Sequence, residues 1–166
     1  MDERADELSR LYLSEGPVVW GFAVRRVGTA SEADEILQET FLVAAKDFEA
    51  VRAAVSARAW LLGIARNVIQ QRHRWFRRRK TVELPYDYPD PPTEQPDSRI
   101  EFMRAAIRRL PQLQREIMEL RLGNELSYAE IAEMLRIPIG TVRSRLHAAV
   151  ASLRKKAEEI ALGAVP

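Results

Sequence analysis

A cluster of hydrogen-bond donors in the last third of the chain comprises Arg143, Ser144, Arg145 and His147. Arginine presents a planar fork of donors, and serine and histidine add further ones, so the set suits phosphate oxygens and base edges. Their spacing would bring them close together on one helix. The cluster therefore predicts nucleic-acid binding rather than bond-breaking chemistry.

Two short helices and a tight turn are predicted to position this cluster. Ser127 and Glu130 have the spacing of a capping box, in which each side chain accepts a hydrogen bond from a backbone donor at the helix start. Pro138 and Gly140 interrupt the helical pattern, and Thr141 begins it again. The apolar stripes are Ile131, Met134 and Leu135, then Val142, Leu146, Leu153 and either Ala149 or Val150. This pattern predicts a helix-turn-helix, and the alternative interpretation is a helical hairpin with a solvated basic face.

Other kinds of site find little support in the sequence. The chain has no cysteine, and its histidines, His73 and His147, are far apart without a carboxylate at a suitable spacing. It shows no glycine-rich phosphate loop, no apolar run near the roughly 20 residues of a membrane span, and no apolar signal core. We therefore expect no catalytic residue, metal, cofactor or membrane insertion, and a cytoplasmic protein that is not an enzyme.

The net charge of +2 hides blocks of opposite sign. The basic block, 51–80, contains no acid, and its cations are Arg52, Arg58, Arg66, Arg72, Arg74, Arg77, Arg78, Arg79 and Lys80. The acidic block, 31–50, has Lys46 as its single cation, and its acids are Glu32, Asp34, Glu35, Glu39, Asp47 and Glu49. Such blocks suit different partners.

The acidic block is predicted to form a helix that starts at Ser31, with Asp34 in the capping position. Its buried stripe is Ile36, Leu37, Phe41 and Ala44, and its exposed side is Asp34, Glu35, Gln38 and Glu39. The helix dipole favours acids in a first turn, but Gln38 and Glu39 lie beyond that turn. Because exposed acids repel phosphate, this side is predicted to meet a basic protein surface.

The basic block is predicted to form a long helix from Arg58 to about Arg79. Its apolar face is Trp60, Leu61, Ile64, Ala65, Val68 and Ile69. Its arginines are predicted to contact phosphates. Trp75 and Phe76 lie inside the basic run, and two interpretations stay open: the rings stack on single-stranded bases, or they cover the domain core.

The rest of the pattern predicts an all-α fold of two small helical domains. Residues 2–27 are predicted to be helical with a break at Gly16 and Pro17, and 47–57 to be a loop. A proline-rich, acidic stretch at 84–98 is typical of an extended linker. Helices at 99–110 and 112–122, divided by Pro111, contribute a second core of Ile100, Met103, Ile107, Leu110, Ile117 and Leu120. We place the domains at 1–82 and 99–166, with the linker at 83–98.

Four stretches together resemble the extracytoplasmic-function sigma factors, a bacterial group of the sigma-70 family whose members guide RNA polymerase to promoters. They are EADEILQETF (Glu32–Phe41), RAWLLGIARN (Arg58–Asn67), LPQLQRE (Leu110–Glu116) and the helix-turn-helix Leu126–His147. The stretches occur in the family's order and span nearly the whole chain. The resemblance implies sigma region 2 in the first domain, region 4 in the second, and a role in a stress response.

The resemblance also implies partners and binding residues. Core RNA polymerase would bind through its flap and through the clamp coiled coil of its largest subunit, the latter on Asp34, Glu35, Gln38 and Glu39. The segment 48–55 and the following helix would read and melt the minus-ten promoter element, through Phe48, Arg52, Arg58, Arg66, Asn67, Arg74, Trp75, Arg77 and Arg78. The minus-thirty-five element would be read by Ser127, Thr141, Arg143, Ser144, Arg145 and His147. An anti-sigma factor is a further candidate partner.

Two rival functions also fit the sequence. One is a stand-alone helix-turn-helix regulator that binds its operator unaided, and the other is an adaptor whose basic blocks bind a protein. The chain shows neither a receiver domain nor an obvious dimerisation helix. A gel shift with and without core polymerase would distinguish the three functions.

Overall fold

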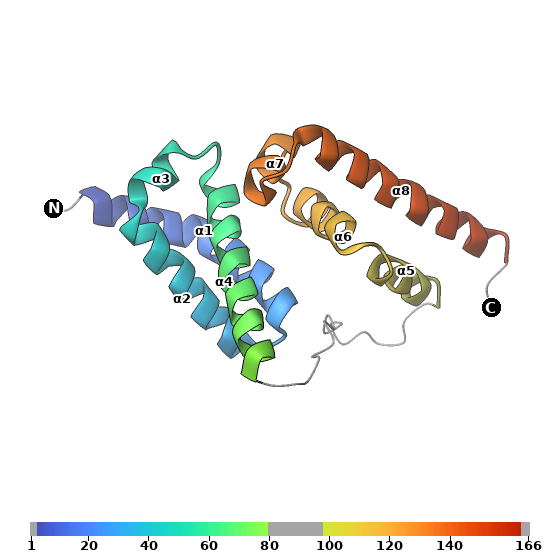
Figure 1. Ribbon diagram of the computed structural model, residues 1–166, viewed down its shortest axis with the longest axis horizontal. Helices are drawn as coiled ribbons and strands as arrows, with labels where there is room; N and C mark the ends of the chain where they lie inside the picture. The colour runs from blue at the N-terminus through green and yellow to red at the C-terminus, as the bar shows by residue number, and fades with distance from the viewer. Residues whose placement is uncertain (1–2, 80–97, 164–166) are drawn as a thin grey trace. The chain divides into compact units, whose positions relative to one another are not determined.

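The computed structural model describes residues 3–79 and 98–163, with the backbone alone at 76–79. All regular secondary structure in these ranges is helical, and the chain divides into two compact units, Met1–Asp90 and Pro91–Pro166 (Figure 1). The predicted all-α fold of two helical domains is confirmed. Apart from Ser98, the predicted linker lies outside the described residues, as do the side chains of Phe76, Arg77 and Arg78.

The described part of the first unit consists of α1 (Glu3–Val27), α2 (Ala30–Lys46), α3 (Phe48–Ala53) and α4 (Ala57–Arg79). Helices α1, α2 and α4 pack pairwise, and the short α3 packs on α2 and α4. The larger buried side chains are Val19, Phe22, Ile36, Leu37, Phe41, Phe48, Val51, Leu61, Leu62, Val68 and Ile69. Burial of this apolar surface stabilises the unit and sets the acidic α2 beside the basic α4.

The predicted break at Gly16 and Pro17 is wrong, because α1 runs continuously through both residues. A proline inside a helix removes one backbone hydrogen bond and crowds the preceding turn. Here Pro17 and Leu13 are exposed, so water can hydrate the carbonyl that loses its donor. Gly16, Val19 and Phe22 on the same helix are buried. Packing of this face therefore outweighs the local cost of the proline.

Two further predictions around α2 need correction. The helix begins at Ala30, and its N-cap is Thr29, whose side chain accepts a hydrogen bond from the backbone N–H of Glu32. Ser31 is therefore inside the helix rather than at its cap. The predicted loop at 47–57 contains α3, held by the buried side chains of Phe48 and Val51. With only six residues, α3 is too short for helical periodicity to reveal it.

The described part of the second unit consists of α5 (Ser98–Arg108), α6 (Gln112–Met118), a π-helical turn η1 (Glu119–Gly123), α7 (Tyr128–Leu135) and α8 (Ile139–Ala161). Its buried side chains include Leu110, Ile117, Leu120, Leu126, Ile131, Val142 and Ala149. The predicted helix 112–122 is thus α-helical only to Met118. The core prediction is wrong for Ile100, which is 49% exposed, whereas Met103 and Ile107 are half-buried.

The first helix of the helix-turn-helix is capped as predicted, and the second begins earlier than predicted. The capping box at α7 is confirmed: the backbone N–H of Ser127 donates to Glu130 at 2.6 Å, and the backbone N–H of Glu130 donates to the Ser127 hydroxyl at 3.2 Å. Arg136 ends α7 in the left-handed conformation, with φ of 55°. Helix α8 then begins at Ile139 rather than Thr141, because Pro138 is its N-cap and Gly140 lies in its first turn.

Candidate functional site

The outer side of α2 carries Asp34, Glu35, Gln38 and Glu39, which we call the acidic face. Asp34, Glu35 and Gln38 are exposed and Glu39 is half-buried, whereas Ala33, Ile36, Leu37 and Thr40 on the opposite side are buried. The predicted division of α2 into a packed side and an exposed acidic side is therefore present in the structure. Asp34 also has a structural contact, because its Oδ1 accepts a hydrogen bond of 2.8 Å from Nε1 of Trp20.

Arg72 of α4 lies against the acidic face. The Arg72 guanidinium donates to Glu35 Oε2 at 2.7 Å and to Glu39 Oε2 at 3.1 Å. Burial lowers the pKa of Arg72, but its hydrogen bonds to the two carboxylates outweigh burial and raise the pKa above the ordinary value. The acidic face is therefore partly neutralised from within the unit, although each carboxylate remains partly exposed.

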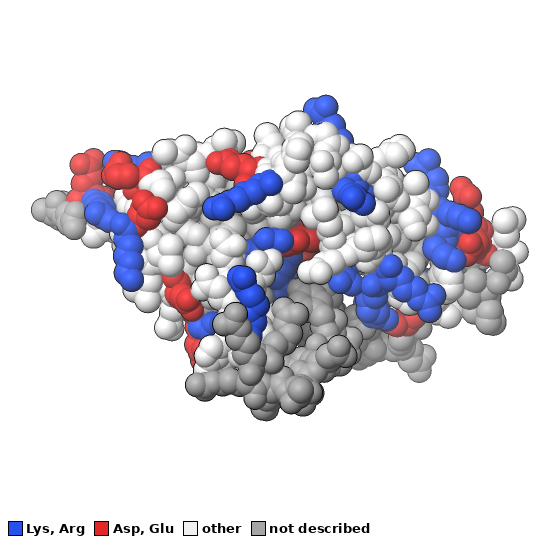
Figure 2. Space-filling model, in the orientation of Figure 1, with Lys and Arg blue, Asp and Glu red and all other residues white. Residues whose placement is uncertain are grey.

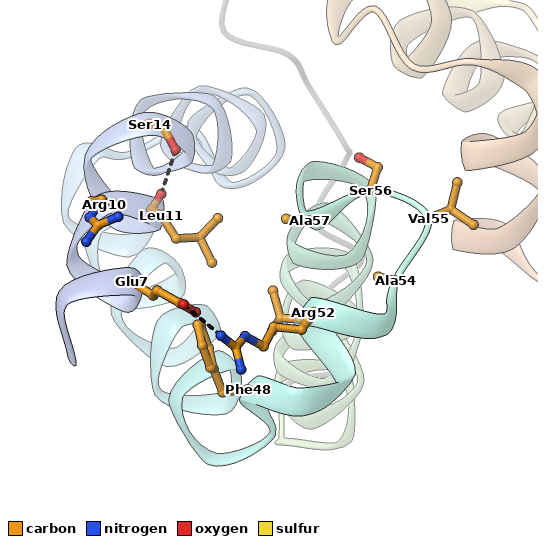
Figure 3. Close-up of a pocket in the computed structure, with 11 residues that line it drawn as sticks. Glu7, Arg10, Leu11, Ser14, Phe48, Arg52, Ala54, Val55, Ser56 and Ala57 are labelled. Carbon is orange, nitrogen blue, oxygen red and sulfur yellow. Dashed lines mark hydrogen bonds and ion pairs between the residues drawn. The ribbon is translucent and has the colours of Figure 1, made fainter. Parts of the chain in front are cut away.

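An open groove of about 530 Å³ lies between α1, α3 and the segment that joins α3 to α4 (Figure 3). Its walls include apolar side chains from all these elements, namely Leu11, Phe48, Val51 and Val55. Glu7, Arg10, Ser14, Arg52 and Ser56 supply its polar groups. The groove combines apolar walls with hydrogen-bonding groups, which suits a flat, polar-edged ligand such as a nucleobase.

Phe48 contributes to this groove from the core. The residue is only 4% exposed, and the guanidinium groups of Arg4 and Arg52 lie 5.9 and 5.7 Å from its ring centroid. Arg4 also donates to the backbone carbonyl of Ala45, beside α3. Phe48 is therefore a core residue that shapes the groove, and its exposed neighbours are better placed to meet a ligand.

Two of the predicted DNA-binding arginines are tethered to acids of α1. Arg52 donates to Glu7 at 2.7 Å, and this hydrogen bond raises the pKa of Arg52. Arg58 donates through Nε to Glu15 at 2.7 Å and through Nη2 to the second carboxylate oxygen at 3.5 Å. Both arginines are therefore paired within the unit, Arg52 at the groove and Arg58 at the start of α4.

The other predicted minus-ten residues lie along α4. Arg66 is half-buried, and Asn67 and Arg74 are exposed. Arg74 donates through Nε to the backbone carbonyl of Gln70 at 3.4 Å. Trp75 is 50% exposed, so half of its surface lies outside the core, and stacking of its ring on bases stays a prediction.

The second unit presents its predicted cluster on α8. Arg143, Ser144, Arg145 and His147 are all exposed, whereas Val142 and Ala149 are buried, which resolves the choice between Ala149 and Val150 in favour of alanine. Thr141 is half-buried, and its backbone carbonyl accepts a hydrogen bond of 3.1 Å from the Ser144 hydroxyl. Ser127 is exposed and serves as the cap of α7. Figure 2 shows basic side chains spread over the visible surface of this unit.

Several residues of these surfaces were not singled out by the sequence analysis. Glu7 and Glu15 are two of them, and they pair with arginines 45 and 43 residues away in the chain. Arg72, predicted with the other arginines of its helix to contact phosphates, instead pairs with Glu35 and Glu39, 37 and 33 residues away. No local pattern signals such contacts. Tyr128 is another, and its ring lies near the guanidinium groups of Arg121 and Arg143. A ring next to a helix cap, with a basic residue seven positions before it, is a weak signal in the sequence.

Neither unit presents a metal or membrane site among its described residues. Across 3–79 and 98–163, no group of three or more His, Cys, Asp and Glu side chains could hold a metal ion. Within the same ranges, no helix is long and apolar enough to cross a membrane. The two charged faces and the groove described above are suited to binding.

Comparison with known protein families assigns both units. The family described as "Sigma-70 region 2" matches residues 11–80, and "Sigma-70, region 4" matches residues 103–153. These ranges correspond to the unit with the acidic face and to the unit with the helix-turn-helix.

Curated relatives are similar along most of the chain. The ECF RNA polymerase sigma factor SigL of Mycobacterium tuberculosis is 34% identical over 157 residues, which cover 90% of this chain and 88% of the relative. The ECF RNA polymerase sigma factor EcfG of Rhodopseudomonas palustris is 32% identical, over 89% of this chain and 83% of its own.

Among solved structures, the sigma factor RpoE of Bartonella quintana, crystallised with the anti-sigma factor NepR, has a similar fold. The TM-score is 0.72 at 21% identity, and the match covers 92% of this chain and 97% of that chain. At this identity the likeness supports the fold alone.

Proposed function

The chain belongs to the sigma-70 family as an extracytoplasmic-function sigma factor, and we propose which of its surfaces perform each part of that function. As an alternative sigma factor it binds core RNA polymerase and directs promoter-specific initiation at minus-thirty-five and minus-ten elements. Sigma factors are initiation factors, so we assign this chain no enzymatic activity. It acts in the cytoplasm, where RNA polymerase works.

The acidic face is the proposed docking site for core polymerase. Its partner is a basic surface, the clamp coiled coil of the largest subunit, to which Glu35 and Glu39 offer charge-assisted hydrogen bonds. The observation that carries this assignment is the exposure of Asp34, Glu35 and Gln38 on α2, although the helix packed beside it, α4, is basic. A unit that bound only DNA would lose affinity through these exposed acids.

The groove and α4 are the proposed minus-ten site. The arginines of α4 follow the phosphates, and an unstacked base enters the groove between α1 and the segment after α3. There the base would contact the apolar wall at Leu11 and the donors of Arg10. The Ser14 hydroxyl, which donates to the Leu11 backbone carbonyl at 3.2 Å, would accept a hydrogen bond from the base (Figure 3). Trp75, exposed beside Arg74, offers a second stacking surface.

The exposed cluster on α8 is the proposed minus-thirty-five site. In a helix-turn-helix the second helix enters the major groove and its amino-terminal residues meet the base edges. Arg143, Arg145 and His147 are exposed within the first turns of α8, and Ser127 at the α7 cap would contact the phosphate backbone. An anti-sigma factor is the proposed regulator, and it would have to cover one of these surfaces.

A gel shift tests the function as a whole. The full chain is incubated with a promoter fragment, alone and with core polymerase, and the expected result is a specific complex only when core is present. A specific complex without core would instead identify a stand-alone regulator. Core binding without any promoter specificity would identify an adaptor.

A further inference from the structure

The ring of Tyr128, in the first turn of α7, lies near the guanidinium groups of two arginines. The Arg121 Cζ lies 5.2 Å from the ring centroid, and the Arg143 Cζ lies 5.9 Å from it. Both distances are within the range of a cation–π interaction. Tyr128 thus contacts η1 through Arg121 and the DNA-binding surface of α8 through Arg143.

Tyr128 and Arg121 are both held in place by neighbouring hydrogen bonds. Tyr128 is half-buried and follows the Ser127 cap, whose two hydrogen bonds fix the first turn of α7. Arg121 Nη1 donates to the backbone carbonyl of Leu126 at 3.0 Å, so this guanidinium is anchored beside the ring. A tyrosine has two side-chain torsions, and the ring is therefore a rigid surface compared with a long arginine side chain.

Arg143 gains most from a fixed neighbour. It is exposed on α8, and an exposed arginine loses considerable rotamer entropy when it takes up one geometry at a base edge. A ring that attracts the guanidinium restricts this freedom before DNA arrives. Arg145, two residues further along, points to a different side of α8, because residues two apart on a helix do not face each other.

We propose that Tyr128 is a positioning residue for Arg143, and that it sets how sharply the protein discriminates the base pair that Arg143 reads. This inference rests on the proposed minus-thirty-five function of α8. It predicts that loss of the ring relaxes selectivity at the base pair read by Arg143 and leaves the base pair read by Arg145 unchanged.

The test uses holoenzyme assembled from core polymerase and the full chain. A promoter library randomised across the minus-thirty-five element is sequenced before and after one round of selection, with wild type, Arg143→Ala and Arg145→Ala. The two arginine variants identify the base pair that each residue reads. Tyr128→Phe, which keeps the ring, and Tyr128→Leu and Tyr128→Met, which remove it, are then compared at those positions.

The expected result is that Tyr128→Leu and Tyr128→Met lower the preference at the Arg143 position about two- to fivefold, the range of an exposed cation–π contact. Tyr128→Phe should match wild type, and Tyr128→Leu should add nothing in an Arg143→Ala background. Unchanged preferences in the ring-less variants, with Arg143→Ala still relaxed, would overturn this inference alone. Unchanged preferences in Arg143→Ala would overturn the proposed role of α8 as well. Melting curves identify which of the two ring-less variants keeps the native fold.

Discussion

Arg72 and Glu35 form a hydrogen-bonded ion pair of 2.7 Å that joins the basic helix α4 to the acidic face of α2. The second terminal nitrogen of Arg72 reaches Glu39 at 3.1 Å. Two carboxylates, one helical turn apart, therefore share one cation, and the three groups together carry a charge of −1 instead of −2. A basic partner meets a weaker field at this face than the sequence alone implies.

Arg72→Gln should strengthen binding to core polymerase. Removal of the internal cation frees both carboxylates for the partner, and we expect a gain of about 0.5–1 kcal/mol, the size of a surface charge pair. The salt dependence of the affinity should become steeper, since more charge is exposed. The dissociation constant is measured at two salt concentrations, with a melting curve.

Arg74→Gln is the matched control for this change, because Arg74 is exposed on the same helix and contacts the Gln70 carbonyl. It removes the same charge away from Glu35 and Glu39. If Arg72→Gln bound core polymerase more weakly than Arg74→Gln, Arg72 would be holding the carboxylates in their docking geometry rather than competing for them.

Glu39→Lys should weaken binding to core polymerase by several kcal/mol, because it sets like charges against each other at the interface. The structure adds a cost to the fold, since the new lysine lies beside Arg72. At a partly exposed pair this cost should be at most about 1 kcal/mol of unfolding free energy. Asp6→Lys, at an exposed position of α1, is the control for net charge. Equal core affinity in Glu39→Lys and Asp6→Lys would remove α2 from the docking site.

The elements that sequence could predict are those with strong local signals. The capping box at Ser127 and the apolar period of α7 and α8 depend on residues three or four apart, and both appear in the structure. The exposed side of α2 follows from the same periodicity. For these elements, local propensity and packing favour the same structure.

Other features depend on contacts that are distant in the chain. Local rules favour a break at Pro17, but the buried residues on either side of it keep α1 intact. The pairing of Arg72 with Glu35 spans 37 residues, and that of Arg58 with Glu15 spans 43. Such pairs become visible only when the helices are packed, so the sequence predicted a docking face without its internal counterion.

Replacement of Arg77, Arg78 and Arg79 together by alanine should reduce open-complex formation. Each phosphate that an arginine neutralises releases counterions, so the salt slope of promoter binding should fall by up to about 0.9 for each phosphate left without its arginine. The measurement is holoenzyme affinity for a promoter fragment across a salt series. A mutant with the wild-type slope would mean that these arginines only solvate the end of α4. Alanine is a good helix former, so the helix itself should persist.

Two residues next to α7 adopt a backbone conformation that normally suits glycine. Glu125 has φ of 58° and Arg136 has φ of 55°, in the left-handed region. A side chain there costs roughly 1–2 kcal/mol, and replacement by glycine removes this strain. Part of the stability gained is lost again, because glycine has greater conformational freedom in the unfolded chain. Glu125→Gly and Arg136→Gly should therefore each raise the free energy of unfolding by about 0.5–1 kcal/mol.

Alanine at the same two positions separates backbone strain from the removal of a side chain. Alanine removes the charge but keeps the Cβ, so Glu125→Ala and Arg136→Ala should not gain the stability of the glycine variants. Equal stability of the alanine and glycine variants in urea unfolding would contradict the strain argument. Promoter binding should not follow the free energy of unfolding at Arg136, because this residue is an exposed cation in the turn before α8. Both substitutions of Arg136 should weaken promoter binding alike, and the glycine variant should do so while being the more stable protein.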